Sequence, residues 1–225
     1  MAKKVSTLNL SEPVGNLTSA EIKIDPGDGN LVVDGLTRND QELASGTLEY
    51  LEKIGLPTWS VDSKKSSPTF MVEAARKGQT WLRLPWAACN GATNWQIHLN
   101  RQIPSSVLAH SDGGNIALDL TGMPVTNVSA ATGGGNIEVV LPDPAEKLIV
   151  TAKSGAGNVT VQVPGDAAFK LQGSTGLGKM ILSPRLSKVD KDCYQTLDYE
   201  QAVRKIDLTL SSGAGNIIVE ERQVP

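Results

Sequence analysis

The residues best suited to acid–base chemistry in this chain are its two histidines, His98 and His110. A histidine titrates near neutral pH and can therefore serve as a general base, as it does in acyltransferases built on left-handed β-helices. Those proteins advance in six-residue steps, and their catalytic histidine lies in a cleft between chains. This chain has no such step, so we expect neither histidine to be catalytic.

Carboxylates are the second candidates, because enzymes that cleave polysaccharides use a pair of acidic side chains or an acid with a basic partner. Asp119 and Glu138 occupy repeated positions of the chain. The equivalent positions in the sequence-adjacent repeats are His98, Val140 and Gln162 for Asp119, and Ala117 and Thr160 for Glu138. We therefore expect no two acids to stack in successive repeats. The sequence predicts no catalytic residues and a protein that is not an enzyme.

Metal and cofactor sites are not predicted either. Cys89 and Cys193 lie 104 residues apart, form no Cys-x-x-Cys pair and share the chain with only two histidines, which disfavours zinc. The glycine-rich turns carry Asp28 and Asp112 as their only acids, too few for a calcium ladder. The phosphate-binding pattern Gly-x-x-x-x-Gly-Lys-Ser/Thr is absent. A net charge of −3 with scattered Lys and Arg predicts no nucleic-acid partner.

The elements that would position any site are set by a repeat of the type Gly-Ala-Gly-Asn. Its Asn, or the residue in that place, recurs at steps of 21, 21, 22, 21 and 37 residues. The positions are Asn94, Asn115, Asn136, Asn158, Lys179 and Asn216, with Asn30 as an earlier copy. Apolar residues stand one and three places after each Asn, with mostly polar residues between them. This alternation predicts a strand with one buried face after each turn.

A second strand precedes each turn, and its small residues at the sixth place before the Asn predict a narrow interior. The turns repeat glycines at the first and third places before the Asn, from which we expect positive φ angles. A Ser or Thr at the fourth place can bond the turn backbone, and the Asn side chains can stack. The sequence thus predicts an all-β, single-domain parallel β-solenoid of about 21 residues per coil, wound right-handed.

The breaks in the period divide the chain. We expect an N-terminal extension over 1–19 and a solenoid over 20–221. Within the solenoid we expect irregular coils over 20–90, regular coils over 91–184, an insertion over 185–204 and a last coil over 205–221. Asp198 could cap a short helix reaching Lys205. The last coil would end at Val219 with an open edge, covered by the insertion or by a second chain.

Four tryptophans gather towards the N-terminal coils: Trp59, Trp81, Trp86 and Trp95. Packing in the core or cap is the favoured interpretation, and a platform for sugar rings is the alternative. No apolar run is long enough to span a bilayer, and Met1–Leu8 has the charges of a signal peptide without its apolar core. The compartment stays open: the cytoplasm, or the soluble part of an envelope-associated protein.

Two segments, Ser154–Val161 (SGAGNVTV) and Ser212–Glu220 (SGAGNIIVE), resemble the repeated motif of bacterial toast-rack proteins. Leu43–Tyr50 (LASGTLEY) and Tyr199–Lys205 (YEQAVRK) resemble other segments of that family, and the resemblance covers roughly 20–221. The family comprises adhesin-like and LiaF-like cell-wall-stress domains of unassigned biochemistry. The resemblance implies a non-enzymatic β-solenoid that acts in envelope sensing or in surface interaction.

Three hypotheses of function follow. The first is an interaction scaffold that binds a protein partner at the cell envelope, with Tyr194, Tyr199 and Arg204 of the insertion as candidate contacts. The second is a protein that assembles into homo-oligomers through its coil ends. The third is a glycan-binding or carbohydrate-active β-helix.

Overall fold

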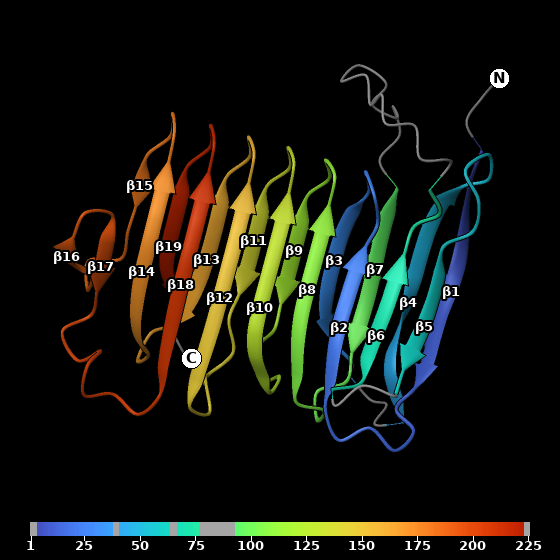
Figure 1. Ribbon diagram of the computed structural model, residues 1–225, viewed down its shortest axis with the longest axis horizontal. Helices are drawn as coiled ribbons and strands as arrows, with labels where there is room; N and C mark the ends of the chain where they lie inside the picture. Colours follow the sequence, from blue (N-terminus) through green and yellow to red (C-terminus); the bar gives the residue numbers. More distant parts are fainter. Residues whose placement is uncertain (1–3, 38–40, 64–66, 77–92, 223–225) are drawn as a thin grey trace.

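The protein is an elongated stack of β-strands in two facing sheets (Figure 1). The computed structural model describes residues 4–37, 41–63, 67–76 and 93–222, and these form strands and turns with no helix. Neighbouring strands are parallel except at the two ends of the stack. The predicted all-β class is therefore confirmed.

Sheet A contains, in spatial order, β1 (Val5–Pro13), β4 (Glu42–Leu51), β7 (Asn94–Leu99), β3 (Asn30–Gly35), β9 (Ile116–Asp119), β11 (Ile137–Val140), β13 (Val159–Pro164), β19 (Ile217–Arg222) and β15 (Met180–Ile181). Sheet B contains β16 (Ser187–Asp190), β17 (Cys193–Gln195), β14 (Ala168–Thr175), β18 (Lys205–Ser212), β12 (Lys147–Ser154), β10 (Val125–Thr132), β8 (Ser105–Ser111), β2 (Ala20–Asp25), β6 (Thr69–Glu73) and β5 (Thr58–Asp62).

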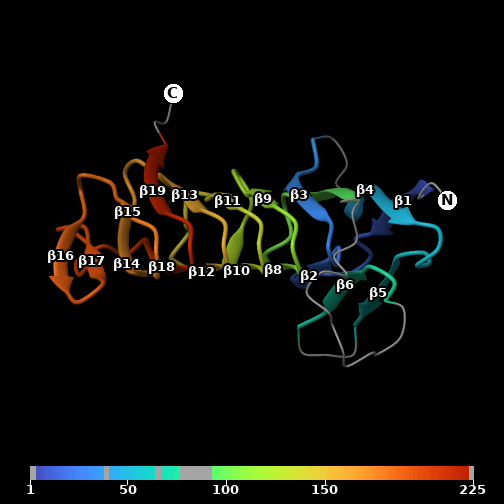
Figure 2. The same cartoon turned by 90° about the horizontal axis from the view of Figure 1, so that it is seen from above.

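The core lies between the two sheets (Figure 2). In sheet A, Ile137 pairs in register with Ile116 on one side and with Val159 on the other, and all three side chains are buried. In sheet B, Ala130 pairs with Ala109 and Ala152, which are also buried. Like residues thus lie over like residues, as the sequence predicts.

The order of the coils in space differs from their order in the sequence. Strand β3 lies between β7 and β9, and strand β19 lies between β13 and β15. In sheet B, β18 likewise lies between β12 and β14. Strand β19, which contains Val219, therefore pairs with β13 on one side and with β15 on the other. The predicted open edge at Val219 is wrong. The outermost complete coil is the one that contains Lys179.

The repeated Asn residues form a hydrogen-bonded ladder along the stack. The side-chain oxygen of Asn136 accepts the backbone N–H of Asn158 at 2.8 Å, and that of Asn158 accepts the N–H of Asn216 at 2.8 Å. The ladder ends when Asn216 accepts the N–H of Lys179 at 2.9 Å. Among the described strands β15 pairs only with β19, so an acceptor in place of Lys179 would have no donor from a further coil. This explains why the Asn is dispensable in that repeat.

A carboxylate closes the ladder at the other end. The Glu49 side chain of β4 accepts both the backbone N–H and the amide N–H of Asn94, each at 2.9 Å. Strand β4 runs antiparallel to β7, so it has no Asn in register to supply the acceptor. Glu49 supplies that oxygen instead, and the backbone donor at the start of the ladder is satisfied.

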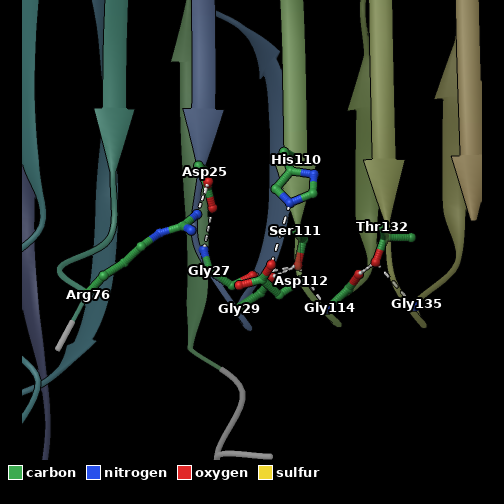
Figure 3. Close-up of polar contacts among 10 residues, drawn as sticks. All are labelled: Asp25, Gly27, Gly29, Arg76, His110, Ser111, Asp112, Gly114, Thr132 and Gly135. Atoms are coloured by element: carbon green, nitrogen blue, oxygen red, sulfur yellow. Dashed lines mark hydrogen bonds and ion pairs between the residues drawn. The ribbon is translucent and has the colours of Figure 1, made fainter. Parts of the chain in front are cut away.

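The Ser and Thr residues of the turns form a second ladder beside the first, part of which is drawn in Figure 3. Thr132 Oγ1 donates to the carbonyl of Gly114 in the coil below at 2.8 Å and accepts the N–H of Gly135 in its own turn at 3.2 Å. Ser111 repeats the pattern with Gly29 and Gly114 at 2.9 and 2.8 Å. Each hydroxyl thus joins one turn to the next and satisfies a donor within its own turn.

The turn glycines are required by contact between coils. A Cβ on Gly135 would stand 2.1 Å from the carbonyl oxygen of Gly114, and a Cβ on Gly157 would stand 2.1 Å from that of Gly135. The expectation of positive φ is wrong for these residues. Among the described repeat glycines only Gly27 has it, with φ of 66°. Gly135 and Gly157 are therefore required because the backbone of the neighbouring coil leaves no room for a Cβ at these places.

Antiparallel strands close the stack in both sheets at the N-terminal end and in sheet B at the C-terminal end. Residues 1–19, expected as an extension, include β1, which pairs with β4 along its whole length. The insertion supplies β17, which pairs with β14 and covers the edge of sheet B. Residues 198–202 form hydrogen-bonded turns, so the predicted short helix is wrong. The segment donates its hydrogen bonds locally to Asp198 and Thr196 and does not continue as a helix.

The described tryptophans belong to the core. Trp95 is 1% exposed, and its indole N–H donates to the carbonyl of Glu49 at 2.9 Å. Trp59 of β5 packs against the core from the edge of sheet B. Packing is therefore confirmed for Trp95. Trp81, Trp86 and Cys89 lie outside the described residues.

The contact between turns can be tested with two adjacent glycines. Gly135→Ala should lower the free energy of unfolding by about 1–3 kcal/mol or more, because its Cβ overlaps a carbonyl oxygen. Gly134→Ala is the matched control. Its Cβ would stand 3.9 Å from the nearest atom, so the change should stay within about 0.5 kcal/mol. Urea unfolding followed by circular dichroism measures both; equal losses would contradict the account of the turns.

The Asn ladder gives a second comparison. Asn136→Ala removes the acceptor of the Asn158 N–H and should cost about 1 kcal/mol. Lys179→Ala changes the exposed end of the ladder and should cost less than about 0.5 kcal/mol. Both variants are measured by urea unfolding. A larger loss from Lys179→Ala than from Asn136→Ala would show that the side-chain ladder does not stabilise the stack.

Candidate functional site

The insertion residues chosen from the sequence occupy three different environments. Tyr194 lies on β17, partly buried against the core, with the Lys188 ammonium 6.0 Å from its ring centroid. Tyr199 is 8% exposed and donates its hydroxyl to the Asp207 carboxylate of β18. Arg204 is exposed. Of the three, Arg204 is thus the residue most open to a partner, and Tyr199 serves to hold the insertion against sheet B.

The charges around Tyr199 explain its anchoring role. Burial, and then the hydrogen bond to Asp207, raise the pKa of Tyr199 well above its usual value. Its hydroxyl therefore stays a donor throughout the physiological range. The ammonium of Lys205 lies 5.0 Å from its ring centroid, and that of Lys170 lies 5.9 Å away. These cations over the ring add a favourable interaction with its π-system.

Asp207 stays ionised beneath this tyrosine. Partial burial alone would raise its pKa, but hydrogen bonds from Lys147 and Tyr199 together with the charges of Lys147 and Lys170 outweigh burial and lower it. The Lys147 ammonium lies 2.6 Å from the carboxylate. A depressed folded pKa stabilises the protein above the unfolded pKa of about 3.9, and this contribution disappears as the pH falls through the folded value.

A groove of ≈ 310 Å³ lies on the outer face of sheet B, and a second hollow of ≈ 710 Å³ lies beside Arg185 and Glu221. Four adjacent strands, β6, β2, β8 and β10, form the floor of the groove. Ser129 and Ala131 of β10 are small, so the taller side chains of the neighbouring strands stand above them. The outward side chains lining the groove are Lys23, Asp25, Met71, Glu73, Leu108 and His110. The groove therefore combines apolar contacts at its centre with charges of both signs at its rim.

The acids of the groove correct one expectation from the sequence. Asp25 of β2 and Glu73 of β6 face each other in register, so two acids do stack on neighbouring strands. Asp25 accepts the N–H of Gly27 at 2.9 Å and forms an ion pair with Arg76. These contacts hold the carboxylate at the turn (Figure 3). The pair thus consists of one structurally engaged acid and one exposed acid.

The same correction applies to the outer face of sheet A. His98 was expected beside Asp119, but β3 intervenes and His98 instead pairs with Asp34, with which it forms a hydrogen bond. The register of Val33 with Leu118 places Asp34 level with Asp119. The error has one cause, because both expectations assumed that coils stack in sequence order.

His110, Ser111 and Asp112 have the composition of a catalytic triad without its geometry. Successive residues of a strand point to opposite faces, so the imidazole of His110 is outside and the hydroxyl of Ser111 is inside. Ser111 is fully buried and donates to a turn carbonyl, whereas His110 Nε2 lies 3.5 Å from Asp112 Oδ1 (Figure 3). A hydrolase triad requires the histidine to take the serine proton, and this arrangement prevents it.

Within the described ranges, no cluster of three or more His, Cys, Asp or Glu side chains could hold a metal ion. The same residues include no helix that could cross a membrane. Cys193 is buried on β17.

Comparison with known proteins agrees with the two-sheet stack. The family model described as the N-terminal domain of toast_rack, DUF2154, matches residues 2–182. The chain belongs to the toast-rack family. The matched region ends before β18 and β19, which are the strands that insert into the toast-rack stack between earlier coils.

One solved structure has the same fold over nearly the whole chain. It is a candidate cell adhesion protein from Clostridium sporogenes ATCC 15579, with 19% identity, a TM-score of 0.82, and coverage of 98% of this chain and 100% of that chain. A candidate adhesin from Bacteroides fragilis NCTC 9343 has 12% identity and a TM-score of 0.39 over 97% of this chain and 98% of that chain. No curated protein matches the sequence.

Sequence reasoning missed the groove because its strands are not successive in the chain. Lys23, Met71, Leu108 and Ser129 stand side by side across four strands, although more than a hundred residues separate the first from the last. The outward residues of a toast-rack strand carry no repeat, so no periodic signal marks them. Only the register of β2 between β6 and β8 reveals the site.

The anchoring role of Tyr199 can be measured by proteolysis. Tyr199→Phe removes a hydrogen bond to a charged group, worth about 1.5–3 kcal/mol, so the insertion should open more often. Trypsin should then cleave after Arg204 about ten times faster, because cleavage follows the population of the open form. Tyr194→Phe, which removes the hydroxyl from β17 of the same insertion, should change the rate less than threefold. Equal acceleration in both would contradict the anchoring role.

Proposed function

We propose that this chain is a non-enzymatic, adhesin-like interaction module that binds a protein partner at the cell envelope through the outer face of sheet B. The observation that carries the proposal is the groove across β6, β2, β8 and β10. Its half-buried Met71 and Leu108 offer apolar contacts, and Lys23, Glu73 and His110 at the rim offer polar ones. An apolar centre with a polar rim is the usual anatomy of a protein-binding surface.

The rigidity of the scaffold supports this function. The groove floor is made of strands paired in register, and both ladders of the turns fix each coil against the next. A preformed surface loses little conformational entropy on binding. Family membership and the cell-adhesion name of the Clostridium sporogenes protein point the same way. The misplaced serine and histidine of the apparent triad support a role without catalysis.

The finer parts of the interpretation belong to the same proposal. We infer envelope sensing or scaffolding as the cellular role, since the family resemblance implies it. We also infer a single solenoid domain over 20–221, right-handed, with coils of about 21 residues. Parallel crossovers strongly prefer that hand, and the register steps of 21 and 22 residues between Ile116, Ile137 and Val159 are compatible with that coil size.

The insertion is a second candidate contact, favoured by its exposed apolar side chains. Leu197 is 89% exposed and Val203 is 83% exposed, and the latter adjoins the exposed Arg204. In this version of the proposal Arg204 contacts the partner directly. Tyr194 and Tyr199 would act from beneath, by holding the segment in place.

Capture of envelope proteins by the immobilised chain, followed by purification of the bound protein, tests the function. Leu108→Asp should weaken binding of that protein at least tenfold, because it places a charge at the apolar centre of the groove. Thr209→Asp is the matched control, since Thr209 lies outward in the same row on β18. It should change the affinity less than threefold.

Arg204→Glu separates the two contact surfaces. A loss of binding in this variant, with Leu108→Asp unaffected, would assign the contact to the insertion. If the native chain retains no envelope protein beyond what heat-denatured chain retains, the proposed function is wrong.

A further inference from the structure

The two ends of the stack differ in the edges that they present. At the C-terminal end, sheet A stops at β15, which has two residues, and sheet B stops at β16, which has four. At the other end, sheet A stops at β1, which has nine residues and pairs only with β4 among the described strands. Short edge strands resist pairing with other chains, whereas a long one presents a row of open N–H and C=O groups.

Strand β1 also projects beyond the opposite sheet. Sheet A continues for three strands past β3, and sheet B continues for two strands past β2 in the same direction. The outer edge of β1 therefore lies at the extreme end of the molecule (Figure 1). Two apolar side chains are exposed at this end. Val5 of β1 is 47% exposed, and Leu56, in the segment that joins β4 to β5, is 55% exposed.

The sequence of β1 is complementary to itself in an antiparallel pair. If Asn9 of one copy faces Asn9 of another, Leu8 faces Leu10, Thr7 faces Ser11 and Ser6 faces Glu12. Leu10 is 2% exposed and Leu8 packs against the core, so the leucines lie on the inner face, while Asn9 is exposed on the outer face. This register joins inner residues to inner residues and places no two like charges opposite each other.

The centre of β1 has few of the residues that usually prevent an edge strand from pairing with another chain. From Ser6 to Glu12 there is no proline and no lysine, and the only charge is Glu12. Pro13 and the register shift beside it stand at the far end of the strand. By contrast, the four-residue edge β16 contains Lys188 and ends at Asp190.

We propose that two copies of this chain associate head to head through antiparallel pairing of β1 with β1, so that sheet A continues from one copy into the other. The contact is isologous, with the two-fold axis passing beside Asn9. The occupant of the edge is a second copy because the strand matches itself in pattern, with Leu8 facing Leu10 and no like charges opposite each other. This surface is separate from the groove, so the proposal stands independently of the proposed partner.

Sedimentation velocity of the full chain over a concentration series tests the proposal, with Asn9→Glu as the main variant. On the two-fold axis this substitution brings two like charges together only in the dimer. It should raise the concentration at half-dimerisation at least tenfold, with no change in the melting temperature beyond 2–3 °C, about 1 kcal/mol or less. Thr47→Glu is the matched control, because Thr47 is exposed and lies directly opposite Asn9 on β4, one strand away from the contact. It should raise the concentration less than threefold.

A mixture of two oppositely charged variants gives a second test of the dimer. An equimolar mixture of Asn9→Glu and Asn9→Lys should form heterodimers at least tenfold more readily than either variant forms homodimers. A native chain that stays monomeric up to about 1 mM overturns the proposal. So does a dimer that Asn9→Glu and Thr47→Glu weaken equally, or that the mixture does not restore. Capture of the envelope protein by Asn9→Glu should equal that of the native chain, which separates this surface from the groove.

Discussion

The structure depends on the close stacking of one glycine turn upon the next. At Gly114, Gly135 and Gly157 the backbone passes so near a carbonyl oxygen of the neighbouring coil that a Cβ would stand about 2 Å from it. This approach sets the Asn and the Ser or Thr within hydrogen-bond distance of the neighbouring turn. The strands then follow in register, and each inward side chain lies on its equivalent. Burial of those side chains is the main stabilising term, but it requires the spacing that the turns impose.

Much of this arrangement of turns, strands and core could be predicted from the sequence repeat. Alternation gives the strands, and the small residues at one repeated place give the stacked row of Ala109, Ala130 and Ala152. The period could not give the order of the coils, since every coil buries the same kinds of residue and fits beside any other. Two exceptions mark the ends of the Asn ladder: Lys179 has no Asn side chain in the outermost coil, and Glu49 of β4 supplies the acceptor for Asn94 at the other end. The role of glycine was equally ambiguous, because positive φ and close approach demand the same residue.

The candidate site was much less predictable than the fold, for a related reason. Inward residues and turn residues are constrained in every coil, so they repeat and can be recognised. Outward residues meet solvent or a partner and do not repeat, so Met71, Leu108 and His110 carry no common signal. Their proximity follows from β2 lying between β6 and β8, which depends on the coil order. The insertion could be located as a break in the period, but only side-chain contacts show that Tyr199 is held against Asp207.

In a solenoid of this kind, the residues that stabilise the fold differ from those available for recognition. The ladders and the core occupy the turns and the inner faces, so most outward side chains take no part in them. The outer face of sheet B can therefore combine residues from any coils that the stacking order makes neighbours, and the groove does so across four strands. The ends of the stack are constrained differently, because the strands there must supply partners for backbone hydrogen-bond groups as well as cover the core. Glu49 and the antiparallel β4 meet that need inside the stack at the N-terminal end, and the outer edge of β1 is left as the part of the scaffold whose hydrogen bonds a second chain can complete.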